Sequence, residues 1–383
     1  MAIHFSEDEF AARRLAACRG MTARGLDGLL MFRQESMFYL TGYDTFGYVF
    51  FQCLYLAADG RMTLLTRAPD LRQAQHTSMI DDIRIWVDKD GVDPTTDLRD
   101  ILDEHGARGG KLGVELEAYG LTGRNWQRLA VTLDGFCTTE DASDLVSRLR
   151  LIKSPAELVY VRRAAELADA ALEAAWASTG PGAFEGDILA AMQGAVFAGG
   201  GDYPGNEYII ASGRDALLCR YFTGRRNLDA DDQLTLEFAG AYRHYHACMM
   251  RLIRIGQPGA RQAHMYATCT EALDETMATL KPGTSMGRVF DAHARVFDAA
   301  GYRDHRLNAC GYSLGTTFAP NWMDWPMFYA DNPVEVAPGM VFFLHMILAD
   351  SDAELGASVG ETVVVTETGC ARLTQSSLDL VIK

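Results

Sequence analysis

Residues 148–158, Arg-Leu-Arg-Leu-Ile-Lys-Ser-Pro-Ala-Glu-Leu, separate two halves of the chain that have different patterns. Ser154 can act as the N-cap of a helix, Pro155 stands where its missing N–H costs nothing, and Glu157 completes a capping box. The stretch therefore predicts a charged helical bridge that leads into a long amphipathic helix at about residues 156–178.

The patterns on either side of this bridge predict two domains, residues 1–147 and residues 148–383. In the first, the periodicity predicts an α/β layer arrangement with a helix at about 6–24 and further elements at 28–32, 48–56, 61–66, 112–116 and 125–133. In the second it predicts helices at about 156–178, 185–198, 260–280 and 286–300, and strands at 208–212, 233–238, 245–254, 340–348 and 362–366. The expected fold class is α/β plus α+β.

Composition and charge exclude several classes of protein. The 383 residues are 48% hydrophobic, enough for a large core, and the formal net charge of −16 repels a phosphate backbone. Residues 1–14 lack the apolar core of a secretion signal, and the longest apolar stretch, around 341–349, is too short to cross a bilayer. The eight cysteines form no C-x-x-C pair, so we expect buried thiols. These features predict a cytoplasmic protein with no nucleic-acid or membrane partner.

A carboxylate in an apolar strand is the first candidate for chemistry. Glu237 lies in Leu234-Thr-Leu-Glu-Phe-Ala-Gly240, where its neighbours favour burial. A buried carboxylate must be paired, bound to a metal, or held with a raised pKa. A salt bridge to an arginine is the structural explanation; otherwise the pattern predicts acid–base or nucleophilic work.

Histidines and a second carboxylate extend the candidate set. His244 and His246 are two apart in a predicted strand, so we expect both imidazoles on one face, as metal ligands, proton shuttles or ordinary hairpin residues. His345 interrupts the apolar run 341–347, where a histidine satisfied by a backbone carbonyl is the structural alternative to catalysis. Glu361 is expected to begin the next strand, either solvated or catalytic.

The loop Cys310–Trp325 combines glycines with aromatic residues. Backbone can approach a ligand at glycine, and aromatic faces can enclose an apolar or cationic group. Tyr312, Trp322 and Trp325 are therefore candidate pocket residues, with packing inside the loop as the alternative.

Several motifs, taken together with the bridge, resemble the creatinase, prolidase and aminopeptidase P superfamily. They are Gly25-Leu-Asp-Gly-Leu-Leu30, Phe38-Tyr-Leu-Thr-Gly-Tyr43, Val336-Ala-Pro-Gly-Met-Val341 and Glu361-Thr-Val-Val-Val-Thr-Glu-Thr-Gly369. The resemblance spans essentially the whole chain. It implies a creatinase-type, ribonuclease H-like N-terminal domain and a pita-bread catalytic domain, in a homodimer.

The peptidase branch of this superfamily holds two metal ions with two Asp, one His and two Glu. By the resemblance, these positions fall here at Glu237, Cys248, Tyr312, His345 and Gly360, the last beside Glu361. One carboxylate, a thiol, a phenol and an imidazole do not make a dinuclear site for hard cations. We therefore expect neither a metal nor another cofactor.

The segment Leu236–Gly240, with Arg243-His-Tyr-His246 and Arg251, is similar to the ectoine hydrolase branch, which opens a cyclic amidine ring. Creatinase relies on a histidine that would fall near Arg220. The resemblance thus implies metal-independent hydrolysis of an amide or amidine C–N bond in a small, nitrogen-rich carboxylate compound.

In this hypothesis Glu237 attacks the electrophilic carbon or activates a water, and a histidine moves the proton to nitrogen. The shuttle candidates are His345, His244 and His246, with Glu361 as a further catalytic candidate. Arg220 would clamp the substrate carboxylate, and the other substrate-binding candidates are Arg251, Tyr312, Trp322 and Trp325. Two alternatives stay open: a metal-dependent Xaa-Pro dipeptidase or aminopeptidase, and a non-catalytic family member that binds a small molecule.

Overall fold

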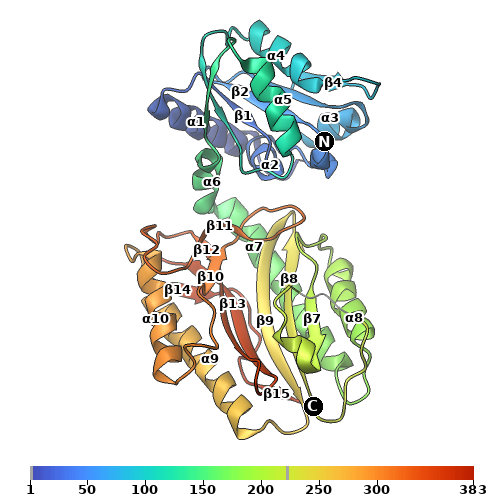
Figure 1. Cartoon of the computed structure of the whole chain (residues 1–383), viewed down its shortest axis with the longest axis vertical. Helices are drawn as coiled ribbons and strands as arrows, with labels where there is room; N and C mark the ends of the chain where they lie inside the picture. The colour runs from blue at the N-terminus through green and yellow to red at the C-terminus, as the bar shows by residue number, and fades with distance from the viewer. Residues whose placement is uncertain (1–2, 221–223) are drawn as a thin grey trace. The chain divides into compact units, whose positions relative to one another are not determined.

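A computed structural model of the chain, which describes residues 3–220 and 224–383, divides it into two compact units, Met1–Arg150 and Leu151–Lys383 (Figure 1). The predicted boundary after residue 147 falls within helix α6 (Asp144–Leu151), close to this division. Each unit has its own sheet and its own hydrophobic core. Among the described residues, no helix is both long enough and apolar enough to cross a membrane.

The first unit is an α/β layer structure, as the sequence predicts. Its elements are α1 (Glu7–Arg24), β1 (Gly28–Met31), α2 (Gln34–Thr41), η1 (Gly47–Val49), β2 (Cys53–Ala57), β3 (Met62–Arg67), η2 (Ala68–Asp70), α3 (Leu71–Thr77), β4 (Ile83–Trp86), α4 (Pro94–Glu104), β5 (Lys111–Val114), α5 (Gly123–Leu133), β6 (Thr138–Asp141) and α6. The sheet has the strand order β4-β3-β2-β1-β5-β6. Only β1–β2 and β2–β3 among these pairs are antiparallel.

The strand predicted at 48–56 is wrong in its first half. The short 3-10 helix η1 occupies Gly47–Val49, and β2 begins only at Cys53. Just before β2, the carbonyl of Phe51 accepts a hydrogen bond from the indole N–H of Trp86 at 2.9 Å. The Phe51 carbonyl is thus satisfied by a side chain and not by a neighbouring strand, so this part of the segment has no need of strand pairing.

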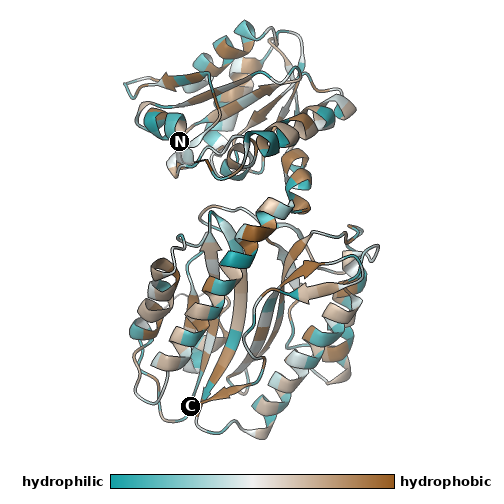
Figure 2. Ribbon diagram, turned by 180° about the vertical axis from the view of Figure 1, so that it is seen from behind, coloured by the Kyte–Doolittle hydropathy of each residue, from teal (hydrophilic) through white to brown (hydrophobic). Residues whose placement is uncertain are grey.

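The second unit is built around a larger sheet. Its elements are α7 (Pro155–Ser178), α8 (Glu185–Ala198), β7 (Ile209–Ser212), η3 (Gly213–Leu217), β8 (Asp232–Tyr242), β9 (Tyr245–Ile255), α9 (Ala260–Thr279), α10 (Met286–Ala299), β10 (Gly311–Ser313), β11 (Asp324–Met327), β12 (Val341–Asp350), β13 (Leu355–Val365), β14 (Cys370–Arg372) and β15 (Val381–Ile382). The main strand order is β11-β10-β12-β13-β9-β8-β7, with β14 beside β13 and β15 beside β9. Helices α7 and α9 cover one face of this sheet in Figure 2, whereas its strands face the viewer in Figure 1.

Helix α7 begins and packs as its sequence dictates. The predicted capping box is confirmed, because Ser154 and Glu157 exchange side-chain to backbone hydrogen bonds at 3.3 and 2.9 Å. Along its length α7 lies so close to β8 that a Cβ on Gly240 would be 2.0 Å from the carbonyl oxygen of Ala164. Glycine at this position therefore permits the close contact between α7 and the sheet. The other face of β8 is not covered by this helix and carries other side chains.

Candidate active site

One row of residues crosses the sheet of the second unit. Glu237 of β8 lies opposite Met250 of β9, and Met250 lies opposite Gly360 of β13. Gly360 in turn lies opposite His345 of β12. Residues opposite one another in an antiparallel sheet project to the same face, so Glu237 and His345 share one face.

Tyr312 joins this face from β10. It lies opposite Phe343, two residues before His345, and the ring centroids of Tyr312 and His345 are 5.7 Å apart. The Tyr312 hydroxyl accepts a hydrogen bond from the indole N–H of Trp322 at 2.8 Å and is hydrogen-bonded to the Glu237 carboxylate. Strands β8 and β10 are not neighbours in the sheet, so the sheet must curve to bring these side chains together.

Glu237 has the electrostatics of an acid–base group. Burial raises its pKa from 4.5 to about 7, against the opposing effects of the Arg220 charge and the Tyr312 hydrogen bond. The cause is loss of hydration, which disfavours the charged form. Near neutral pH the carboxyl group therefore populates both protonation states, which suits a group that accepts and releases protons.

His345, on the same face of the sheet, stays neutral. Burial lowers the pKa of His345 to about 4, and the positive charge of Arg220 acts in the same direction. Its Nδ1 atom is buried and has no hydrogen-bond partner within residues 3–220 and 224–383. A neutral imidazole with an unused nitrogen can take up or pass on a proton.

Arg220 supplies positive charge to the site. Burial of each group is the largest influence on the pKa values of Glu237, His345 and Tyr312, and the positive charge of Arg220 is a further one. Cys219, beside it, was not a candidate from sequence; burial and then the Glu237 charge raise the pKa of its thiol. The signal that could have found it is its place next to Arg220 in the chain.

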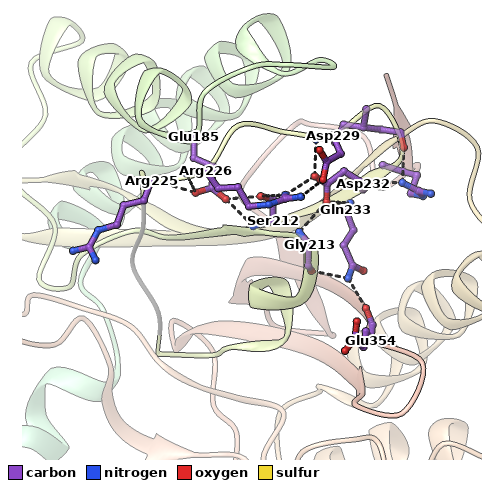
Figure 3. Close-up of polar contacts among 11 residues, drawn as sticks. Glu185, Ser212, Gly213, Arg225, Arg226, Asp229, Asp232, Gln233 and Glu354 are labelled. Carbon is purple, nitrogen blue, oxygen red and sulfur yellow. Dashed lines mark hydrogen bonds and ion pairs between the residues drawn. The ribbon is translucent and has the colours of Figure 1, made fainter.

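A polar network joins the end of β7, the start of β8 and the start of α8 (Figure 3). The Glu185 carboxylate on α8 accepts hydrogen bonds from the backbone N–H and the hydroxyl of Ser212 at 2.9 and 2.6 Å. Arg226 donates to the Ser212 hydroxyl at 2.7 Å and forms an ion pair with Asp232 at the start of β8. Since these partners stand at the ends of β7, β8 and α8, the network fixes the end of β7, from which η3 and Arg220 follow, relative to the start of β8.

The two hairpin histidines do not share a strand face, so that prediction is wrong. His244 lies in the turn between β8 and β9 with φ 63°, and its ring stacks on Phe318 at 4.1 Å between centroids. His246 uses both ring nitrogens, accepting from the backbone N–H of Gly205 at 2.8 Å and contacting the Thr317 hydroxyl at 3.1 Å. Burial lowers the pKa of His246 to about 3, so this ring connects loops as a neutral group.

Glu361 and Arg251 lie on the opposite face of the sheet from Glu237. Glu361 is opposite Leu344 and Arg251 opposite Leu236, so strand alternation directs both away from the row described above. The two form a buried ion pair with each other. The sequence predicts Glu361 at the start of a strand, but it lies within β13. The structure therefore does not bring the candidates Glu361 and Arg251 to the site.

The two tryptophans of the glycine-rich loop differ in position. Trp322 is 2% exposed and contacts Tyr312, whereas Trp325 is partly buried and packs against the core between β12 and helices α9 and α10. The structure thus brings together Glu237, Tyr312, His345 and Trp322, with the exposed Arg220 near enough for its charge to affect the pKa of Glu237, and leaves Trp325 partly buried against the hydrophobic core.

The sequence matches models of two protein families, which together cover most of its length. Residues 13–152 match the Creatinase/Prolidase N-terminal domain, and residues 159–367 match Metallopeptidase family M24. The chain belongs to metallopeptidase family M24. The family resemblance inferred from the motifs is therefore confirmed.

Relatives of this M24 protein include enzymes with different substrates. It is 26% identical to the ectoine hydrolase of Halomonas elongata, over 100% of this chain and 99% of that protein. It is 25% identical to the Xaa-Pro dipeptidase of Pyrococcus furiosus, over 62% of this chain and 67% of that protein. Both are hydrolases by name.

Solved structures confirm the two-domain creatinase/prolidase architecture with a pita-bread second domain. The prolidase of Thermococcus sibiricus superposes with a TM-score of 0.89 at 19% identity, covering 99% of this chain and 100% of that one. The dipeptidase PepE of Mycobacterium ulcerans gives a TM-score of 0.85 at 24% identity, covering 99% of each chain. At these identities the likeness establishes the fold alone.

The family name implies a metal centre, but the donor positions of this M24 protein do not fit one. Cys248 is fully buried and offers sulfur, a soft donor, whereas the hard cations of such a site prefer oxygen ligands. Gly360 offers no donor, and a Cβ there would lie 2.7 Å from the Phe343 ring. Within the described residues, no three His, Cys, Asp or Glu side chains are grouped so as to hold a metal ion.

Proposed function

We propose that this M24 protein is a metal-independent hydrolase that cleaves the C–N bond of a small, nitrogen-rich carboxylate compound, with Glu237 as nucleophile or general base. The observation that carries the proposal is the Glu237 carboxylate, buried, hydrogen-bonded by Tyr312 and with a pKa of about 7. A carboxylate with these properties can act near neutral pH without a metal ion.

The groups around Glu237 have chemistry that suits the remaining steps. His345 presents a neutral imidazole whose Nδ1 has no hydrogen-bond partner among the described residues, and it would deliver a proton to the leaving nitrogen. Arg220 would bind the substrate carboxylate through two parallel hydrogen bonds. Tyr312 and Trp322 would line the pocket, and Tyr312 would also keep the Glu237 carboxylate oriented.

The relatives favour this reaction class without deciding the substrate. The ectoine hydrolase match extends over the whole chain, whereas the Xaa-Pro dipeptidase match covers 62% of it. Ectoine and related cyclic or linear amidines that carry a carboxylate are therefore the first compounds to test, with creatine and Xaa-Pro dipeptides beside them.

The test compares the parent protein with Glu237→Gln and Glu237→Ala on ectoine, creatine and Xaa-Pro dipeptides. Metal content is measured in the same preparations by elemental analysis. Glu173→Gln, an exposed carboxylate on α7, is the matched control. We expect the control to retain parental turnover and both Glu237 variants to lose at least about a hundredfold.

Each other outcome has a distinct meaning. Full turnover by Glu237→Gln removes this residue from the mechanism. Dipeptide cleavage that needs added manganese or cobalt and disappears with a chelator supports the Xaa-Pro dipeptidase alternative. Tight binding of a compound that the parent never turns over supports a non-catalytic member of the family.

A further inference from the structure

A small cavity lies beside Glu237, on the same face of the sheet. Its volume is about 20 Å³. Most of its lining is aliphatic, including Ile209, Met250 and Ile347, and polar side chains reach it at Thr235, Glu237, Ser358 and Cys219. The cavity is therefore an apolar space with a few polar groups near the candidate catalytic carboxylate.

Ser358 is the unusual member of this lining. It is 3% exposed, and its hydroxyl is buried with no hydrogen-bond partner among the described residues. Ser358 lies opposite Ile347, two residues from Gly360, and so shares the face of the row that joins Glu237 and His345. A buried hydroxyl without a partner destabilises the folded protein, so Ser358 needs a partner that the described residues do not supply.

The size and polarity of the cavity fit a single water molecule. A water needs a cavity of at least about 10–15 Å³ and two to four polar partners. The hydroxyls of Ser358 and Thr235 and the carboxylate of Glu237 provide such partners. Tyr312 takes one hydrogen-bond position of that carboxylate, and a carboxylate has about four, so others remain for a water.

We infer that Ser358 and Glu237 hold the hydrolytic water of the reaction in this cavity. The inference rests on the proposed function and deepens it, since it makes Glu237 the base that acts on a bound water. The water oxygen forms a bond to the electrophilic carbon while Glu237 takes one of its protons. The C–N bond then breaks, and that proton passes to the leaving nitrogen, so water is divided between the two products. Ser358 is a positioning residue, because it orients the water and does not touch the substrate.

The test uses Ser358→Ala and the control Ser313→Ala in the full-length protein. Ser313 is likewise buried with an unpartnered hydroxyl among the described residues, but it lies outside the cavity, and strand alternation directs it away from the face of Tyr312. We expect Ser358→Ala to lower kcat about 10- to 100-fold with KM unchanged. The acid limb of the kcat–pH profile should move to higher pH, because the water no longer stabilises the Glu237 carboxylate. The control should change neither quantity.

A crystal structure at high resolution is the second measurement. The parent and Ser313→Ala should contain a water within hydrogen-bond distance of both Ser358 and Glu237, and Ser358→Ala should lack it. Parental kcat in Ser358→Ala, or a parent cavity that holds no such water, overturns the inference even when Glu237→Gln is inactive. If Glu237→Gln is active, it is the proposed function that fails, so the two failures are distinguishable.

Discussion

Replacing Glu237 by glutamine should make the protein more stable, and more so as the pH rises. The pKa of Glu237 is 4.5 in its ordinary environment and about 7 in the folded protein. The folded state thus binds this proton more tightly than the unfolded chain does. The stability that results is fully present below pH 4.5 and is lost as the pH rises through 7. Each tenfold change in proton affinity is worth about 1.4 kcal/mol, so an ionised Glu237 costs the folded protein about 3 kcal/mol above pH 7.

The assay is urea unfolding of the parent and Glu237→Gln at pH 5 and pH 8, with free energies from linear extrapolation. Glutamine keeps the shape of the side chain and cannot ionise, so the stability advantage of the variant should grow by about 2–3 kcal/mol between these pH values. The exposed control Glu173→Gln should show no such growth. A difference between parent and variant that is the same at both pH values would refute the reasoning, because it would mean that burial does not raise the pKa of this carboxyl group.

Three further predictions concern the surrounding residues. Glu361→Gln leaves the buried Arg251 without its counter-charge and should reduce the free energy of unfolding by about 3–5 kcal/mol, measured by the same urea assay. Arg220→Met removes a charge that lowers the pKa of Glu237, so the acid limb of the kcat–pH profile should move to higher pH, whereas Arg220→Lys should keep it in place. Arg226→Ala loosens the network of Figure 3 and should lower kcat/KM about tenfold through the position of Arg220, with the acid limb moving in the same direction as in Arg220→Met. A variant that loses only thermal stability would contradict this last expectation.

The carboxylate at the centre of the site could be predicted because its signal is local. Glu237 stands among apolar residues in a strand, and burial follows from its neighbours alone. Its pairing with His345 depends on the register across β9 and β13, which a single sequence does not contain. The aromatic loop could be recognised by composition, but only packing decides that Trp322 contacts Tyr312 while Trp325 lies partly buried against the core.

The errors have a common origin in where strands begin. The last long strand is predicted to begin at residue 362, but it begins at Leu355. Glu361 therefore lies inside the strand and is fully buried, not at a strand end. His244 was expected in a strand and lies in the turn, because two consecutive residues with positive φ close the hairpin there. Where a strand begins or ends therefore decides whether a candidate side chain is buried within the sheet or lies in a turn.

The Phe343 ring over Gly360 bears on how such a site can evolve. The Cβ of a carboxylate side chain at position 360 would lie 2.7 Å from this ring, so substitution at that position alone would damage the packing. A carboxylate at this position would need coordinated changes at Phe343 and Gly360. The two positions, on neighbouring strands, would then be epistatic, because the effect of a substitution at residue 360 would depend on which residue stands at 343.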